Sequence, residues 1–171
     1  MTTLRGWWPW LGLVARLVVG TVWVAAGWLK LPDPAASVRA VRAYRILPES
    51  VVPLVGHGLP ILEIATGLLL IVGLGVRIAA IVSLLLQVAF IIGISSAWWR
   101  GLQIECGCFG GGGGTIPDAT SKYPWEIARD SGLAILAALL VVWPRTRFAL
   151  DNALFAPSYD DEDDKAEEPI R

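Results

Sequence analysis

The sequence predicts an all-α fold: a polytopic membrane four-helix bundle with a short interfacial helix after the first span. Two features of composition favour this class. The chain of 171 residues is 55% hydrophobic, and its mean hydropathy of +0.60 is typical of membrane proteins rather than of soluble domains. In addition, most of the nine tryptophans stand near the ends of four apolar segments, as in the aromatic belts of membrane helices.

Each apolar segment is a candidate span, because a helix needs about 20 apolar residues to cross a bilayer. The fourth segment is the shortest and depends on its neighbours to span. Four spans would place both termini on the same side of the membrane. We expect an N-terminal segment at 1–10 and a membrane domain over 11–147, with spans at about 11–29, 51–74, 78–98 and 126–143.

Between the first two spans, residues 35–47 alternate apolar and basic side chains at helical spacing. Prolines before this segment end the first span. The pattern favours a short helix lying in the membrane interface. Its three arginines, Arg39, Arg42 and Arg45, are then placed to bind lipid phosphates.

The C-terminal residues 148–171 read as an acidic, disordered tail. Residues 157–171 hold seven acidic residues against two basic ones, a net charge of −5, so that residues 1–156 carry +4 within the total of −1. Basic residues are not interleaved with aromatic ones on one soluble face, so nothing indicates a nucleic-acid site.

Both cysteines of the chain, Cys106 and Cys108, lie in a Cys/Gly-rich loop at 99–125. Gly107 between them allows a small disulfide ring to close, and such a bond belongs to the labile or catalytic kind. The glycines at 110–114 predict a mobile loop without helix or strand. The alternative is two free cysteines that are merely small buried side chains.

Ionisable side chains within spans are costly and usually functional. Helical rise places Glu63, Arg129 and Asp130 at similar depth, just beneath the cysteine loop. Adjacent residues on a helix do not face each other, so we expect Arg129 to pair with Glu63, and Asp130 to pair with Lys30 at the end of the first span. These ion pairs either have a functional role or only hold the helices of the bundle together.

Two further ionisable groups have simpler interpretations. Arg16 lies close to the opposite surface and is expected to reach it by snorkelling. His57, the single histidine, is either a proton carrier for thiol chemistry or a side chain that meets interfacial water.

Several short motifs stand in order along the chain: Arg16 early in the first span, GWLKLPDP at 27–34, LPILE at 59–63, CGCFG at 106–110 and RD at 129–130. Together they resemble the MauE branch of the DoxX-like membrane proteins over roughly residues 10–145. The resemblance implies a small four-helix membrane protein linked to extracytoplasmic thiol–disulfide metabolism. The namesake, from methylamine utilisation, is implied in maturing the disulfide-rich small subunit of methylamine dehydrogenase beside a thioredoxin-like partner.

The leading hypothesis is therefore a membrane thiol–disulfide relay, a component of a thiol–disulfide oxidoreductase system, in which Cys106 and Cys108 exchange electrons with an extracytoplasmic thioredoxin-like protein. Glu105 disfavours a thiolate on Cys106, which favours Cys108 as the attacking thiol. A quinone near Glu63 and Arg129 would serve as electron acceptor, although no motif marks its site. The alternatives are a non-enzymatic membrane scaffold for a partner enzyme and a copper-binding Cys-x-Cys loop, for which no nearby Met or His completes a site.

Orientation follows from two opposing signals. The count of basic residues favours long loops in the cytoplasm, whereas disulfides persist outside it. We give more weight to the disulfide, and expect cytoplasmic termini, an extracytoplasmic cysteine loop and lipid around the spans.

Overall fold

The computed structural model describes residues 4–144, 146 and 148–151, with side chains from residue 9 onward. It confirms the predicted all-α fold, including the short helix after the first span. Three helices are long and apolar enough to cross a membrane, and α5 is a fourth long helix beside them. The elements are α1 (Leu4–Lys30), α2 (Pro34–Ala43), α3 (Val52–Val72), α4 (Val76–Trp99), the 3₁₀ turn η1 (Ala119–Ser121) and α5 (Tyr123–Val142).

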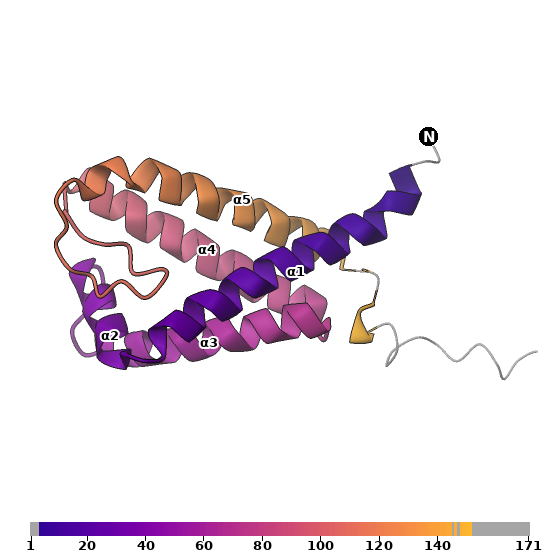
Figure 1. Cartoon of the computed structure of the whole chain (residues 1–171), viewed down its shortest axis with the longest axis horizontal. Coiled ribbons are helices and arrows are strands. Elements are labelled where there is room, and N and C mark those ends of the chain that lie inside the picture. Colours follow the sequence, from indigo (N-terminus) through magenta and orange to yellow (C-terminus); the bar gives the residue numbers. More distant parts are fainter. Residues whose placement is uncertain (1–3, 145, 147, 152–171) are drawn as a thin grey trace, which may run out of the picture.

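The four long helices run along the length of the molecule (Figure 1). The short helix α2 and the loop between α4 and α5 lie together at one end. The start of α1 and the last described residues lie at the other end, so the described termini share a side. Many large apolar side chains remain exposed along the helices, as expected of surfaces that face lipid.

Helices α1 and α3 approach each other through glycines. A Cβ atom added to Gly67 would lie 2.6 Å from the carbonyl oxygen of Gly20, and one added to Gly20 would lie 2.9 Å from that of Gly67. About two helical turns further along, a Cβ on Gly27 would lie 2.7 Å from the carbonyl oxygen of Pro60. Small residues permit such close backbone contact, which replaces the hydrophobic effect as the source of helix association in a bilayer.

The centre of the bundle is built around Trp23 of α1, which is 2% exposed. Its indole nitrogen donates a 2.7 Å hydrogen bond to the Ser83 hydroxyl of α4, so the polar edge of the ring is satisfied. Apolar side chains from all four long helices surround it. This cluster comprises Ala15, Val19, Trp23, Leu70, Ala79, Ala80, Leu133 and Leu140.

Helix α2 begins with a capped N-terminus. Asp33 accepts a 3.0 Å hydrogen bond from the backbone nitrogen of Ala36, and Pro34 occupies the first turn, a favoured arrangement. Arg39 donates to the other oxygen of Asp33, and this hydrogen bond lowers the pKa of Asp33 below its ordinary value. Arg42 pairs with Glu49 in the same way, so two of the three arginines expected to bind lipid phosphates already have carboxylate partners.

Arg16 does not reach the surface as expected but is 1% exposed. Its Nη1 donates to the Thr146 hydroxyl at 2.9 Å and its Nη2 to the Phe148 carbonyl at 3.1 Å. The chain after α5 therefore folds back and supplies the acceptors that solvent was expected to supply.

The first residues of the predicted tail are thus part of the fold. Asp151 accepts hydrogen bonds from the backbone nitrogens of Gly75 at 2.8 Å and Val76 at 3.0 Å, and so caps the start of α4. The acidic run at 157–171, with the disorder expected for it, lies outside the described residues.

The glycine contact between α1 and α3 generates a first prediction. Gly67→Ala should lower the stability of the bundle by about 1–3 kcal/mol, because the added methyl group meets the Gly20 carbonyl and the backbone must separate. The measurement is the unfolding midpoint of the purified protein in detergent with increasing sodium dodecyl sulfate. Gly132→Ala in α5 is the matched control, since no atom lies within 4 Å of its added Cβ. Equal midpoints for the two variants would contradict the glycine packing.

Candidate functional site

The structure joins Cys106 and Cys108 in a disulfide, with 5.5 Å between their Cα atoms. Gly107, between them, has a φ of +73°, a left-handed conformation that glycine adopts without a steric penalty. The residue type at this position therefore allows the chain to turn back and bring the two sulfur atoms together.

The cysteine loop is a packed hairpin rather than the loose segment expected from its glycines. Ile104 and Thr115 form an antiparallel bridge, and the Glu105 nitrogen donates to the Gly114 carbonyl at 2.9 Å. The glycines lie against helix α2: a Cβ on Gly113 would lie 2.6 Å from the Cα of Ala40. The glycine run thus allows the backbone of the loop to pack closely against the backbone of α2.

Two tyrosines hold the hairpin from beneath. The Tyr44 hydroxyl at the end of α2 donates a 2.8 Å hydrogen bond to the Cys106 carbonyl. Burial, the main cause, raises the pKa of Tyr44 well above its ordinary value, so the hydroxyl keeps the proton that this bond needs. The Tyr123 hydroxyl at the start of α5 lies 2.7 Å from the Leu102 carbonyl oxygen and accepts from the Ile104 nitrogen at 3.2 Å.

The two cysteines differ in access. Cys106 is 8% exposed and packs in a core cluster with Ile94, Ala97 and Tyr123. Cys108 is only partly buried and lies at the edge of that cluster. An incoming thiol would therefore meet Cys108 first, the residue for which sequence alone favoured the attacking role.

Two ion pairs lie in the same half of the bundle, but not between the partners expected. Lys30 Nζ lies 2.5 Å from Glu63 Oε1, and Arg129 Nη2 lies 2.8 Å from Asp130 Oδ1. The predicted pairing of Arg129 with Glu63 and of Asp130 with Lys30 is wrong. The glycine contacts set α1 directly on α3, which leaves Lys30 facing Glu63, and the long Arg129 side chain folds back along its own helix to reach its chain neighbour.

Arg129 contacts the cysteine loop as well as Asp130. Its guanidinium carbon lies 4.8 Å from the centre of the Phe109 ring, a cation–π distance. A small cavity of about 10 Å³ lies next to it, lined by Cys108, Arg129, Asp130 and Gln87 among others. Cys108 therefore borders the same small cavity as the arginine–aspartate pair.

His57 lies apart from this geometry in the first half of α3. Its side chain is exposed, and its Nδ1 lies 2.7 Å from the Pro53 carbonyl oxygen of the same helix. The backbone contact engages one of its two ring nitrogens, and a role as proton carrier stays a prediction.

Sequence reasoning missed Tyr44 and Phe109 and gave Gln87 no role. Phe109 lies inside the CGCFG motif, so its position next to Cys108 could have marked it as a residue of the site. Gln87 was the most polar side chain of an otherwise apolar span. Tyr44 gave no signal, since nothing in the sequence indicates that the end of α2 lies beneath the loop.

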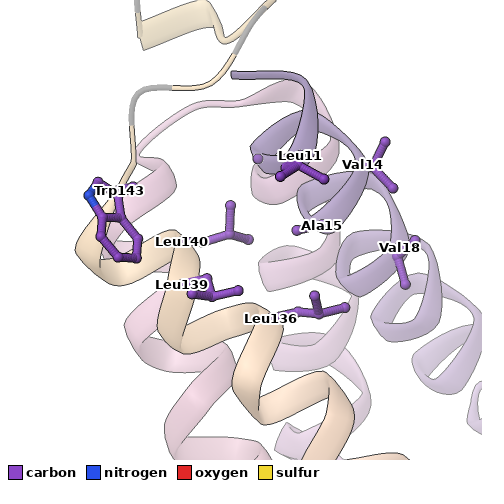
Figure 2. Close-up of a pocket in the computed structure, with 9 residues that line it drawn as sticks. Leu11, Val14, Ala15, Val18, Leu136, Leu139, Leu140 and Trp143 are labelled. Carbon is purple, nitrogen blue, oxygen red and sulfur yellow. The ribbon is translucent and has the colours of Figure 1, made fainter. Parts of the chain in front are cut away.

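A second hollow lies in the half of the bundle that holds the described termini. It is an apolar groove of about 190 Å³ between α1 and α5, with Leu11 and Val18 on one wall and Leu136 and Leu140 on the other (Figure 2). The residues that line this groove carry no ionisable or thiol group. Within the described residues, no group of three or more His, Cys, Asp or Glu side chains is placed to hold a metal ion.

The chain was compared with known protein families. The family model described as "Methylamine utilisation protein MauE" matches residues 8–144. This range contains α2–α5, nearly all of α1 and the whole cysteine loop. Neither a curated protein nor a solved structure matches the chain.

The Lys30–Glu63 pair generates a second prediction. Both side chains are at most 5% exposed, so removing one partner leaves a buried charge without compensation, at a cost of about 3–5 kcal/mol. Lys30→Met and Glu63→Gln should each lower the unfolding midpoint in detergent strongly, and the double variant should lose less than the sum of the two. Strictly additive losses would show that the two groups do not interact.

Proposed function

The chain belongs to the MauE family, and from that premise we propose that it is a membrane thiol–disulfide relay or maturation factor. Cys106 and Cys108 are its reacting groups, and an extracytoplasmic protein with a thioredoxin-like dithiol is its partner. The observation that carries the proposal is the disulfide between these two cysteines at one end of the bundle. A bond so placed is open to a soluble partner, while the helices keep it at the membrane.

The exchange runs in two steps that conserve electrons and protons. A thiolate of the partner attacks the Cys108 sulfur, the Cys106–Cys108 bond breaks, and Cys106 leaves as a thiolate that takes up a proton. The second thiol of the partner then loses its proton and attacks the mixed disulfide, which releases Cys108 as a thiol. Two electrons and two protons pass from the partner dithiol to the cysteine pair, so the partner is oxidised, and the reverse sequence reduces a partner disulfide.

The unequal access of the two cysteines supports this order of events. Cys108 is the more exposed of the pair, so it suits the role of the sulfur that meets the partner. Cys106 is held from below by Tyr44 and suits the role of the resolving thiol. The relay thus assigns a different task to each cysteine.

The tight packing of the hairpin against α2 favours a second candidate, a scaffold in which the disulfide only staples the loop. Closing so short a ring removes little entropy from the unfolded chain. A scaffold would therefore lose little stability and no partner binding when either cysteine is replaced. A copper site, the remaining alternative, would lose metal binding equally with either cysteine and would form no mixed disulfide.

Replacing the cysteines one at a time is the test of the relay. With the partner in its disulfide form, the Cys108 thiolate of Cys106→Ser should attack it and accumulate a mixed disulfide, visible on a non-reducing gel as a band that disappears on reduction, because the resolving thiol is missing. Cys108→Ser is the matched control and should accumulate none, while both variants lose relay activity. The absence of an adduct in both variants, with activity intact, would sink the relay in favour of the scaffold.

We further propose that the cysteine loop is extracytoplasmic and both termini are cytoplasmic. After mild reduction of intact cells, a membrane-impermeant maleimide should label Cys108 in the Cys106→Ser variant. The matched measurement uses permeabilised cells, in which the same residue should be labelled to the same extent. Labelling that requires permeabilisation would place the loop in the cytoplasm and reverse the topology.

A further inference from the structure

The surroundings of Cys108 contain a charged pair that the exchange steps do not use. Arg129 and Asp130, in the first half of α5, both line the small cavity that Cys108 also lines. Asp130 is 3% exposed, and its Oδ1 accepts a 2.9 Å hydrogen bond from Nε of Arg129 and lies 2.8 Å from Nη2 in the ion pair. The guanidinium is thus held in one orientation beside the disulfide.

We propose that this pair sets the acidity of Cys108, with Arg129 stabilising its thiolate and Asp130 positioning Arg129 and limiting its effect. The proposal rests on the relay function, which it deepens by naming the residues that control the reacting thiol. A thiolate is stabilised by a neighbouring cation and destabilised by a neighbouring anion. The two residues therefore act on Cys108 with opposite signs.

The contact with Phe109 ties Arg129 to the cysteine loop. Phe109 follows Cys108 directly in the chain, and its ring lies 4.8 Å from the Arg129 guanidinium carbon. Any arrangement that keeps this contact keeps the cation close to the Cys108 backbone. Arg129 is partly exposed, with 26% of its side chain accessible, whereas the side chain of Asp130 is 4% accessible, so the anion is the better shielded partner.

Two polar oxygens without partners among the described residues belong to side chains that line the cavity, among mostly apolar ones. Asp130 Oδ2 and Gln87 Oε1 are both buried and have no hydrogen-bond donor within the part of the chain that the structure describes, and both residues line the cavity. A volume of about 10 Å³ is close to that of one water-sized probe. The Asp130 carboxylate thus keeps one oxygen without a hydrogen-bond donor from the described chain, on a residue that borders the same cavity as Cys108.

Other charged groups near the loop are engaged elsewhere or face away from this cavity. Glu105 does not line the cavity, and its carboxyl group lies against Gly111. On α2, Arg39 is paired with Asp33.

Three more ionisable groups lie below or beside the site. Lys30 at the end of α1 is paired with Glu63 of α3. Glu126 lies one turn before Asp130 on α5 and does not line the cavity. Glu126 is therefore a matched control: it tests whether any carboxylate near Arg129 on this helix changes the acidity of Cys108.

The test measures the acidity of Cys108 without any partner. In the full-length Cys106→Ser protein, reconstituted in lipid, Cys108 is the single thiol, and the rate of its alkylation by iodoacetamide is followed against pH. Asp130→Asn should lower the pH midpoint of alkylation by about one unit, since the cation is left uncompensated. Arg129→Gln should raise the midpoint, and Arg129→Lys should restore it toward the parent value.

Two controls separate this role from a structural one. The double variant Arg129→Gln/Asp130→Asn should return near the parent midpoint, whereas general loosening of the site would move every variant in the same direction. Glu126→Gln should shift the midpoint by less than half as much as Asp130→Asn. Shifts of equal sign in the two single variants, or no shift in either, would overturn the proposal.

The result is independent of the relay test. Opposite shifts without a mixed disulfide would keep the charged pair as the control of Cys108 acidity and remove the relay. A mixed disulfide without the shifts would keep the relay and remove the role of Arg129 and Asp130.

Discussion

The buried contact between Lys30 and Glu63 is the constraint on which the cysteine half of the molecule depends. It ties the end of α1 to the middle of α3 with a 2.5 Å ion pair in a setting that is almost fully shielded. A lone charge in that place would be expensive, so the two helices are held in one register. The glycine contacts along the same interface also require this arrangement of the two helices. The cysteine hairpin packs against the end of α1, since Gly110 lies against the Leu29 backbone.

Hydropathy, together with the positions of proline and glycine, made most of the fold predictable. Long apolar runs can only be helices in a bilayer, because every backbone polar group must be satisfied within the segment, and prolines and glycines mark where those helices end. The short helix α2 was foreseen from the spacing of Arg39 and Arg42, and the proximity of the two cysteines from their separation in sequence. These features depend on local chemistry, which a single sequence displays directly.

The contacts between helices were not predictable in the same way. Rise per residue gives the depth of Glu63, Arg129 and Asp130, but not the rotation of each helix about its axis, and the ion partners depend on that rotation. The fate of Arg16 depended on residues 130 positions further along the chain, beyond the reach of any local pattern. The glycine run was ambiguous for a related reason: glycine suits a loose segment and a tightly apposed one equally, and only the presence of Ala40 against it decides.

The way Arg16 is satisfied has a consequence for how the protein is made. Its acceptors, Thr146 and Phe148, are synthesised long after α1 has entered the membrane, and Asp151, which caps α4, follows them. Throughout synthesis of α3, α4 and α5, a cation on the first helix therefore waits without the partners that the finished bundle provides. The contacts of Arg16 can form only after residues 146–148 have left the ribosome, so the first helix to be made is among the last to gain its partners.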